Sequence, residues 1–138
     1  MIRIHIKGRS IPLIYTVWEM KQVQEEIGPL NEAISLVLGR NPDDKEDSSK
    51  YGTPEHLAAA AKLIRILGNA GLEEDGQEAN LTEKTILRAL KPVEFAQAIN
   101  ACMDAMNEGM SSEIEQEKPK GPVDVGLEEI RKKKETED

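Results

Sequence analysis

The 138-residue sequence contains few aromatic residues and a single cysteine. The aromatic residues make up 3% of it: Trp18, Phe95, Tyr15 and Tyr51. A hydrophobic core must therefore consist mainly of Leu, Ile, Val, Ala and Met. Because Cys102 has no second cysteine to pair with, an internal disulfide is excluded and a reducing cytoplasm is expected.

Positive charge is also scarce. The chain carries 18 Lys and Arg against 26 Asp and Glu, a net charge of −8, and its dense basic run at residues 131–134 is flanked by glutamates. Nucleic acids and anionic membranes bind clustered Lys and Arg, so neither is expected as a partner. No apolar stretch has the length of a membrane span, and residues 1–7 lack the apolar core of a signal peptide. Both observations favour a cytoplasmic protein.

The N-terminal residues have the period of β-strands. Ile2, Ile4 and Ile6 alternate with charged or polar residues, and the alternation resumes at Ile11 after a glycine turn. The pattern predicts a β-hairpin, in which Pro12 makes the second strand an edge or irregular strand. Two strands alone are marginally stable in water, so the hairpin must pack on helices or pair with another chain.

The period then becomes helical. Apolar stripes and cap residues predict five helices, over residues 16–27, 29–38, 54–67, 82–90 and 92–110. Thr16 and Glu19 form a capping box at the first start, and Gly68-Asn69-Ala70-Gly71 is expected to stop the third helix. The fold class predicted is α+β and mostly α, with the hairpin packed on a bundle of about five helices in a domain of residues 1–112. Residues 113–138, rich in Glu and Lys, are expected to form a disordered charged tail.

The sequence offers little chemistry. His5 and His56 have no second ligand at metal spacing, so both are expected at the surface and no metal is predicted. Cys102 lies on the apolar stripe of the last helix, where a cysteine is usually a small core residue. The acidic segment 41–47 lacks the ligand alternation of an EF-hand and is expected to be a solvated loop. No catalytic residue, no cofactor and no enzymatic activity are predicted.

Two groups of apolar residues are candidates for partner binding. Met103, Met106 and Met110 recur at helical spacing, which favours a role in the core, although such methionines also form adaptable binding faces. In the tail, Leu127 and Ile130 lie in a short segment with acids first and bases last, which could fold as one or two helical turns on a partner. Self-association is left open.

The order of these elements resembles the tail assembly chaperones of long-tailed bacteriophages and prophages. The resemblance covers roughly residues 1–110. It rests first on the strand–glycine turn–strand opening at residues 2–15 and on the first helix, Trp18-Glu19 to Glu25-Glu26-Ile27-Gly28. It rests also on three segments of the second half, in which proline and glycine stand at set places: Leu81-Thr82-Glu83, Leu90-Lys91-Pro92-Val93-Glu94-Phe95 and Met106-Asn107-Glu108-Gly109.

The resemblance implies a chaperone that binds the hydrophobic tape measure protein and recruits tail tube subunits, without remaining in the finished particle. Many weakly binding copies would coat such a client through avidity. One alternative is another phage adaptor or scaffold, such as a head–tail connector component, which would stay in the particle. Another is a small helical regulator that binds DNA through residues 54–67 and 83–108, but no basic helix face supports it.

Overall fold

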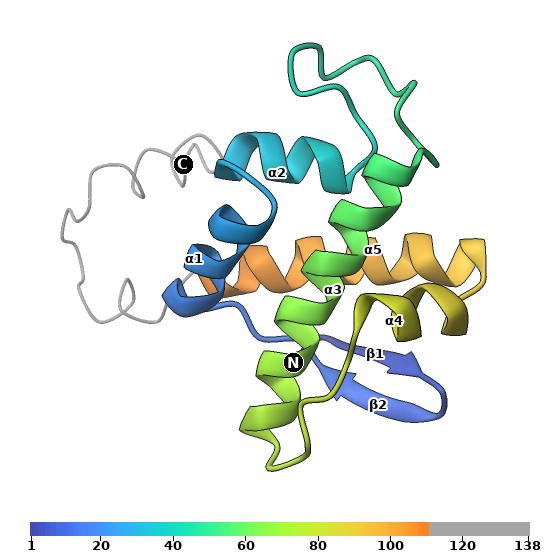
Figure 1. Cartoon of the computed structure of the whole chain (residues 1–138). Helices are drawn as coiled ribbons and strands as arrows, with labels where there is room; N and C mark the ends of the chain where they lie inside the picture. Colours follow the sequence, from blue (N-terminus) through green and yellow to red (C-terminus); the bar gives the residue numbers. More distant parts are fainter. Residues whose placement is uncertain (111–138) are drawn as a thin grey trace, which may run out of the picture.

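The computed structural model describes residues 1–110, which form a hairpin followed by five helices (Figure 1). In chain order these are β1 (Arg3–Ile6), β2 (Arg9–Pro12), α1 (Val17–Glu26), α2 (Leu30–Val37), α3 (Pro54–Glu74), α4 (Glu83–Ala89) and α5 (Pro92–Met110). The predicted α+β, mostly helical fold is confirmed. The predicted tail, with Leu127 and Ile130, lies outside the described residues.

The hairpin shows why a proline is tolerated in β2. Its antiparallel register pairs Arg3 with Pro12 and Ile4 with Ile11. Beyond the strands, the Leu13 N–H donates to the Ile2 carbonyl at 2.9 Å. Hydrogen-bonded pairs alternate with non-bonded pairs in such a ladder, so Pro12 occupies a position whose missing N–H would point away from β1. The proline therefore removes no bond between the two strands.

Side-chain caps set the helix starts. The Thr16 N–H donates to the Glu19 carboxylate at 2.8 Å, which confirms the predicted capping box. The hydroxyl oxygen of Thr53 accepts the His56 N–H at 3.2 Å, and that of Thr82 accepts the Thr85 N–H at 3.1 Å. These local bonds explain why sequence patterns locate the starts of α1, α3 and α4 well.

The central helix α3 is longer than expected, because Gly68-Asn69-Ala70-Gly71 does not stop it. The helix continues to Glu74. Both glycines are buried where another segment crosses the helix: a Cβ on Gly68 would lie 2.6 Å from Leu81 Cδ1, and one on Gly71 would lie 1.7 Å from the Pro12 carbonyl oxygen. The glycines permit close packing here, and the helical hydrogen bonds run on through them.

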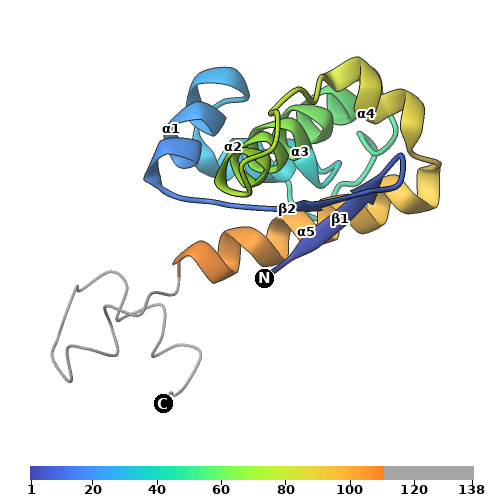
Figure 2. The same ribbon diagram turned by 90° about the horizontal axis from the view of Figure 1, so that it is seen from below.

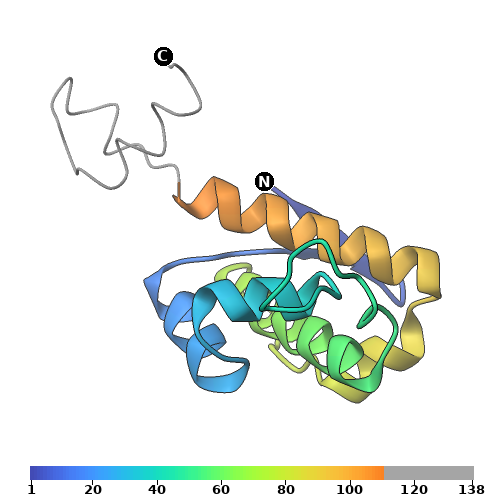
Figure 3. The ribbon, with the colours of Figure 1, turned by 90° about the horizontal axis from the view of Figure 1, so that it is seen from above.

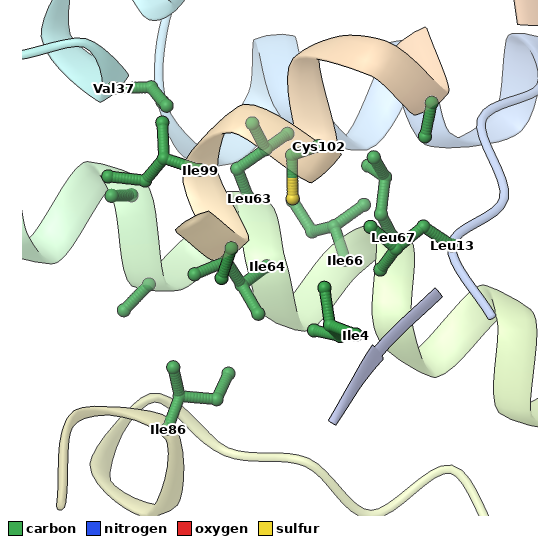
Figure 4. Close-up of a cluster of buried hydrophobic side chains, with 14 of the residues drawn as sticks. Ile4, Leu13, Val37, Leu63, Ile64, Ile66, Leu67, Ile86, Ile99 and Cys102 are labelled. Atoms are coloured by element: carbon green, nitrogen blue, oxygen red, sulfur yellow. The ribbon is translucent and has the colours of Figure 1, made fainter. Parts of the chain in front are cut away.

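The core lies around α3, which contacts α1, α2, α4, α5 and β2. Figure 4 shows its isoleucine and leucine side chains meeting residues of α5 and the hairpin, among them Ile99, Cys102 and Ile4. Helix α5 crosses behind α3 in Figure 1, and it runs beside β1 in Figure 3. Two strands that would be marginal alone are thus held against two helices.

Candidate functional site

A largely apolar cleft lies where α3 begins and α4 passes into α5. This cleft has a volume of about 390 Å³. It is lined by residues from the end of the 40–52 loop and from all three helices: Tyr51, Gly52, His56, Leu57, Leu87, Leu90, Pro92 and Phe95. We call it the Leu87 cleft. Pockets of such size and lining are where proteins usually hold apolar groups of a ligand.

The junction between α4 and α5 builds one side of the Leu87 cleft. Leu90 ends α4 in an extended conformation, at φ −106° and ψ 135°, because the following Lys91-Pro92 step disfavours further helix. The chain then restarts as α5, which places Phe95 at the floor, 7% exposed. At the rim, Leu87 is 41% exposed and Tyr51 54% exposed, so this end of the protein leaves large apolar side chains in water.

His56 lies beside the cleft and is 1% exposed, so the prediction of a surface histidine was wrong for this residue. Its ring centroid is 4.5 Å from that of Tyr51 and 6.3 Å, edge-on, from that of Phe95. The Gly52 N–H donates to Nδ1 at 2.9 Å, so Nδ1 carries no proton and the neutral ring has its proton on Nε2. Nε2 has no hydrogen-bond partner among residues 1–110. His5 is exposed, as predicted.

Acid is expected to weaken the fold through His56. Burial lowers the pKa of His56 below its ordinary 6.5, an effect partly opposed by the Val37 carbonyl. Below about pH 6.5 the unfolded chain therefore binds a proton that the folded chain resists, and stability present at neutral pH is lost as the pH falls. Urea unfolding between about pH 7.5 and 5.5 should show this slope. His56→Gln should reduce this slope, and an unchanged slope in His56→Gln contradicts the assignment.

The three methionines singled out in the sequence do not share one environment. Met106 is buried at 6% exposure, Met103 is half-buried, and Met110 is 42% exposed. The favoured core interpretation is therefore confirmed for Met106, while Met110 is open to contact. The other candidates, Leu127 and Ile130, lie beyond the described residues, and partner binding by this group stays a prediction.

Sequence patterns did not predict that the residues of the Leu87 cleft form a site. One signal was available: Ile86 and Leu87 are neighbours in a short helix, and a helix that packs on one side directs adjacent side chains differently, so one of the two is expected at the edge of the buried face. The structure buries Ile86 fully and leaves Leu87 exposed. A second exposed apolar patch, at Val17 and Trp18 on α1, borders a more polar groove than the Leu87 cleft.

Asp44 and Asp47 of the acidic loop accept hydrogen bonds from backbone N–H groups of the same loop. The side-chain oxygen of Asp44 accepts the Glu46 N–H at 3.1 Å. Asp47 accepts the Ser49 N–H at 2.9 Å, and this bond lowers the pKa of Asp47. The predicted solvated loop thus consists of turns closed by side chains.

Among residues 1–110, no cluster of three or more His, Cys, Asp or Glu is placed to hold a metal ion. No helix in the same range is long and apolar enough to cross a membrane. Comparisons with protein-family models, with curated proteins and with solved structures found no match.

Proposed function

We propose that this chain is an assembly chaperone that binds an apolar helical segment of another protein through the Leu87 cleft. The observation that carries the proposal is an apolar cleft whose rim residues, Leu87 and Tyr51, are about half exposed to water. A helix laid across such a surface can insert a large side chain and cover the rim. The ring of His56 is buried and accepts the Gly52 N–H, so this part of the lining is already ordered before a partner binds.

The resemblance supplies the identity of the client in this proposal. The client is the tape measure protein of a long-tailed phage or prophage, and the complex recruits tail tube subunits. A long apolar helical client repeats similar segments along its length, so many copies of a small chaperone can cover it even when each binds weakly. A net charge of −8 keeps the coated client apart from other chains.

Co-expression with the tape measure protein encoded in the same genome tests the proposal. We expect this chain to move the client into the soluble fraction and to co-purify with it. Leu87→Ser removes apolar surface from the rim at little expense in stability, because the side chain is 41% exposed, and should abolish the effect. Val17→Ser, at a 78% exposed site on α1, is the matched control.

Two results count against the proposal. The first is a client that stays as insoluble with this chain as without it. The second is an equal loss of client solubilisation in Leu87→Ser and Val17→Ser, which would show that binding does not depend on the cleft in particular. A finished particle that contains this chain in stoichiometric amount would favour the adaptor alternative.

A further inference from the structure

Contrary to the expectation from the sequence, one helix face is basic, namely the exposed face of α4 beside the Leu87 cleft. On α4, Leu87 and Arg88 follow Lys84 by three and four residues, which places the three on one face of the helix. Lys91 lies just beyond the end of α4, between Leu90 and Pro92 of the cleft lining, and all four residues are exposed. Figure 2 shows α4 at one end of the molecule, leading directly into α5. Two cations thus share a helix face with Leu87, the one exposed leucine of α4, and a third follows the helix, in a protein whose net charge is −8.

Lys84, Arg88 and Lys91 form no ion pair within the part of the chain that the structure describes. Among residues 1–110 no carboxylate oxygen lies within 4.0 Å of their charged nitrogens, whereas Arg65 holds both Glu26 and Glu83. The glutamate of α4 is therefore turned away from the basic face and neutralised. The carboxylate of Glu94 accepts the backbone N–H of Lys91 at 2.8 Å. It caps the start of α5, and the Lys91 ammonium has no ion-pair partner within residues 1–110.

We infer that the Leu87 cleft selects an acidic amphipathic helix, which places a large apolar side chain in the cleft and carboxylates against Lys84, Arg88 and Lys91. This inference rests on the proposed function and adds the charge of the partner. Complementary charge fixes orientation and speeds encounter. The acidic remainder of the chain repels such a helix, so the partner is guided to this end of the molecule.

Two designed peptides test the charge preference. Each has about 18 residues, enough for a helix, and the same leucine stripe at i, i+3, i+4 and i+7. The remaining positions are Glu in one peptide and Lys in the other. By fluorescence anisotropy with the full chain at low ionic strength, we expect the Glu peptide to bind at least about tenfold more tightly than the Lys peptide. Added salt should weaken binding of the Glu peptide.

Charge reversal provides the matched comparison. Arg88→Glu should weaken binding of the Glu peptide and strengthen binding of the Lys peptide. Lys45→Glu, which also replaces a cation by Glu but on the exposed 40–52 loop, should change neither affinity. If both peptides bind equally and Leu87→Ser abolishes binding of both, the cleft remains a binding site and the charge inference is overturned. Failure of both peptides, when co-expression still solubilises the client, also overturns the inference alone. Failure of both peptides and of co-expression overturns the inference and the proposed function together.

Discussion

The substitution Gly71→Ala is expected to destabilise the fold severely. An alanine Cβ there would lie 1.7 Å from the Pro12 carbonyl oxygen and 2.5 Å from its carbon. Both are backbone atoms of a buried segment. That segment is also tied to α3 where the Ile14 N–H donates to the Leu67 carbonyl at 3.2 Å. Helix propensity favours alanine by only about 1 kcal/mol, so we expect a net loss of roughly 3 kcal/mol or more, the upper end for overpacked sites.

Urea and thermal unfolding measure this effect, with a fall in Tm of at least about 10 °C expected. Gly68→Ala is the matched control on the same helix. Its Cβ would meet Leu81 Cδ1 at 2.6 Å, the end of a side chain that can rotate away, so a smaller loss is expected. If Gly71→Ala were as stable as the parent chain, the hairpin and α3 would not approach as closely as they do here.

The same glycines show where sequence reasoning ends. The capping box at Thr16 and the break at Lys91-Pro92 are local signals, and both predicted the structure correctly. A glycine pair inside a helical pattern has two meanings, a stop or a close approach, because the residue type reports only that the backbone is unrestricted. Which meaning applies at Gly68 and Gly71 depends on Pro12 and Leu81, which reach α3 only in the folded chain.

The residues of the Leu87 cleft could not be predicted from the sequence for a related reason. His56 is enclosed by Tyr51, five residues earlier, and by Phe95, far along the chain. Histidine is of intermediate burial in general, so its own position in a first helical turn favoured the surface. The Leu87 cleft likewise joins a loop and three helices, and only their packing brings an exposed leucine next to Phe95. Apolar periodicity predicts which residues face the core, and it does not predict where the core is left open.

Cys102 is expected to be almost inert in the native protein. The side chain is 0% exposed, and burial raises the pKa of its thiol, which suppresses the thiolate that reacts with alkylating reagents. Ile99 and Met106, one turn away on either side, are also buried. An alkylating reagent can therefore reach the thiol only when α5 separates from the core. If this requires global unfolding, the native rate falls at least about a thousandfold below the rate in denaturant.

Met110→Cys in a Cys102→Ala background is the control for this experiment, because position 110 is on the same helix and 42% exposed. That thiol should react with iodoacetamide at nearly the same rate with and without denaturant. Rapid labelling of native Cys102 would mean that α5 opens readily from α3. The face that carries Met103 and Met106 would then be available to a partner, and the methionine binding surface would gain over the Leu87 cleft. Slow labelling of Cys102 with fast labelling of position 110 leaves the cleft as the favoured binding surface.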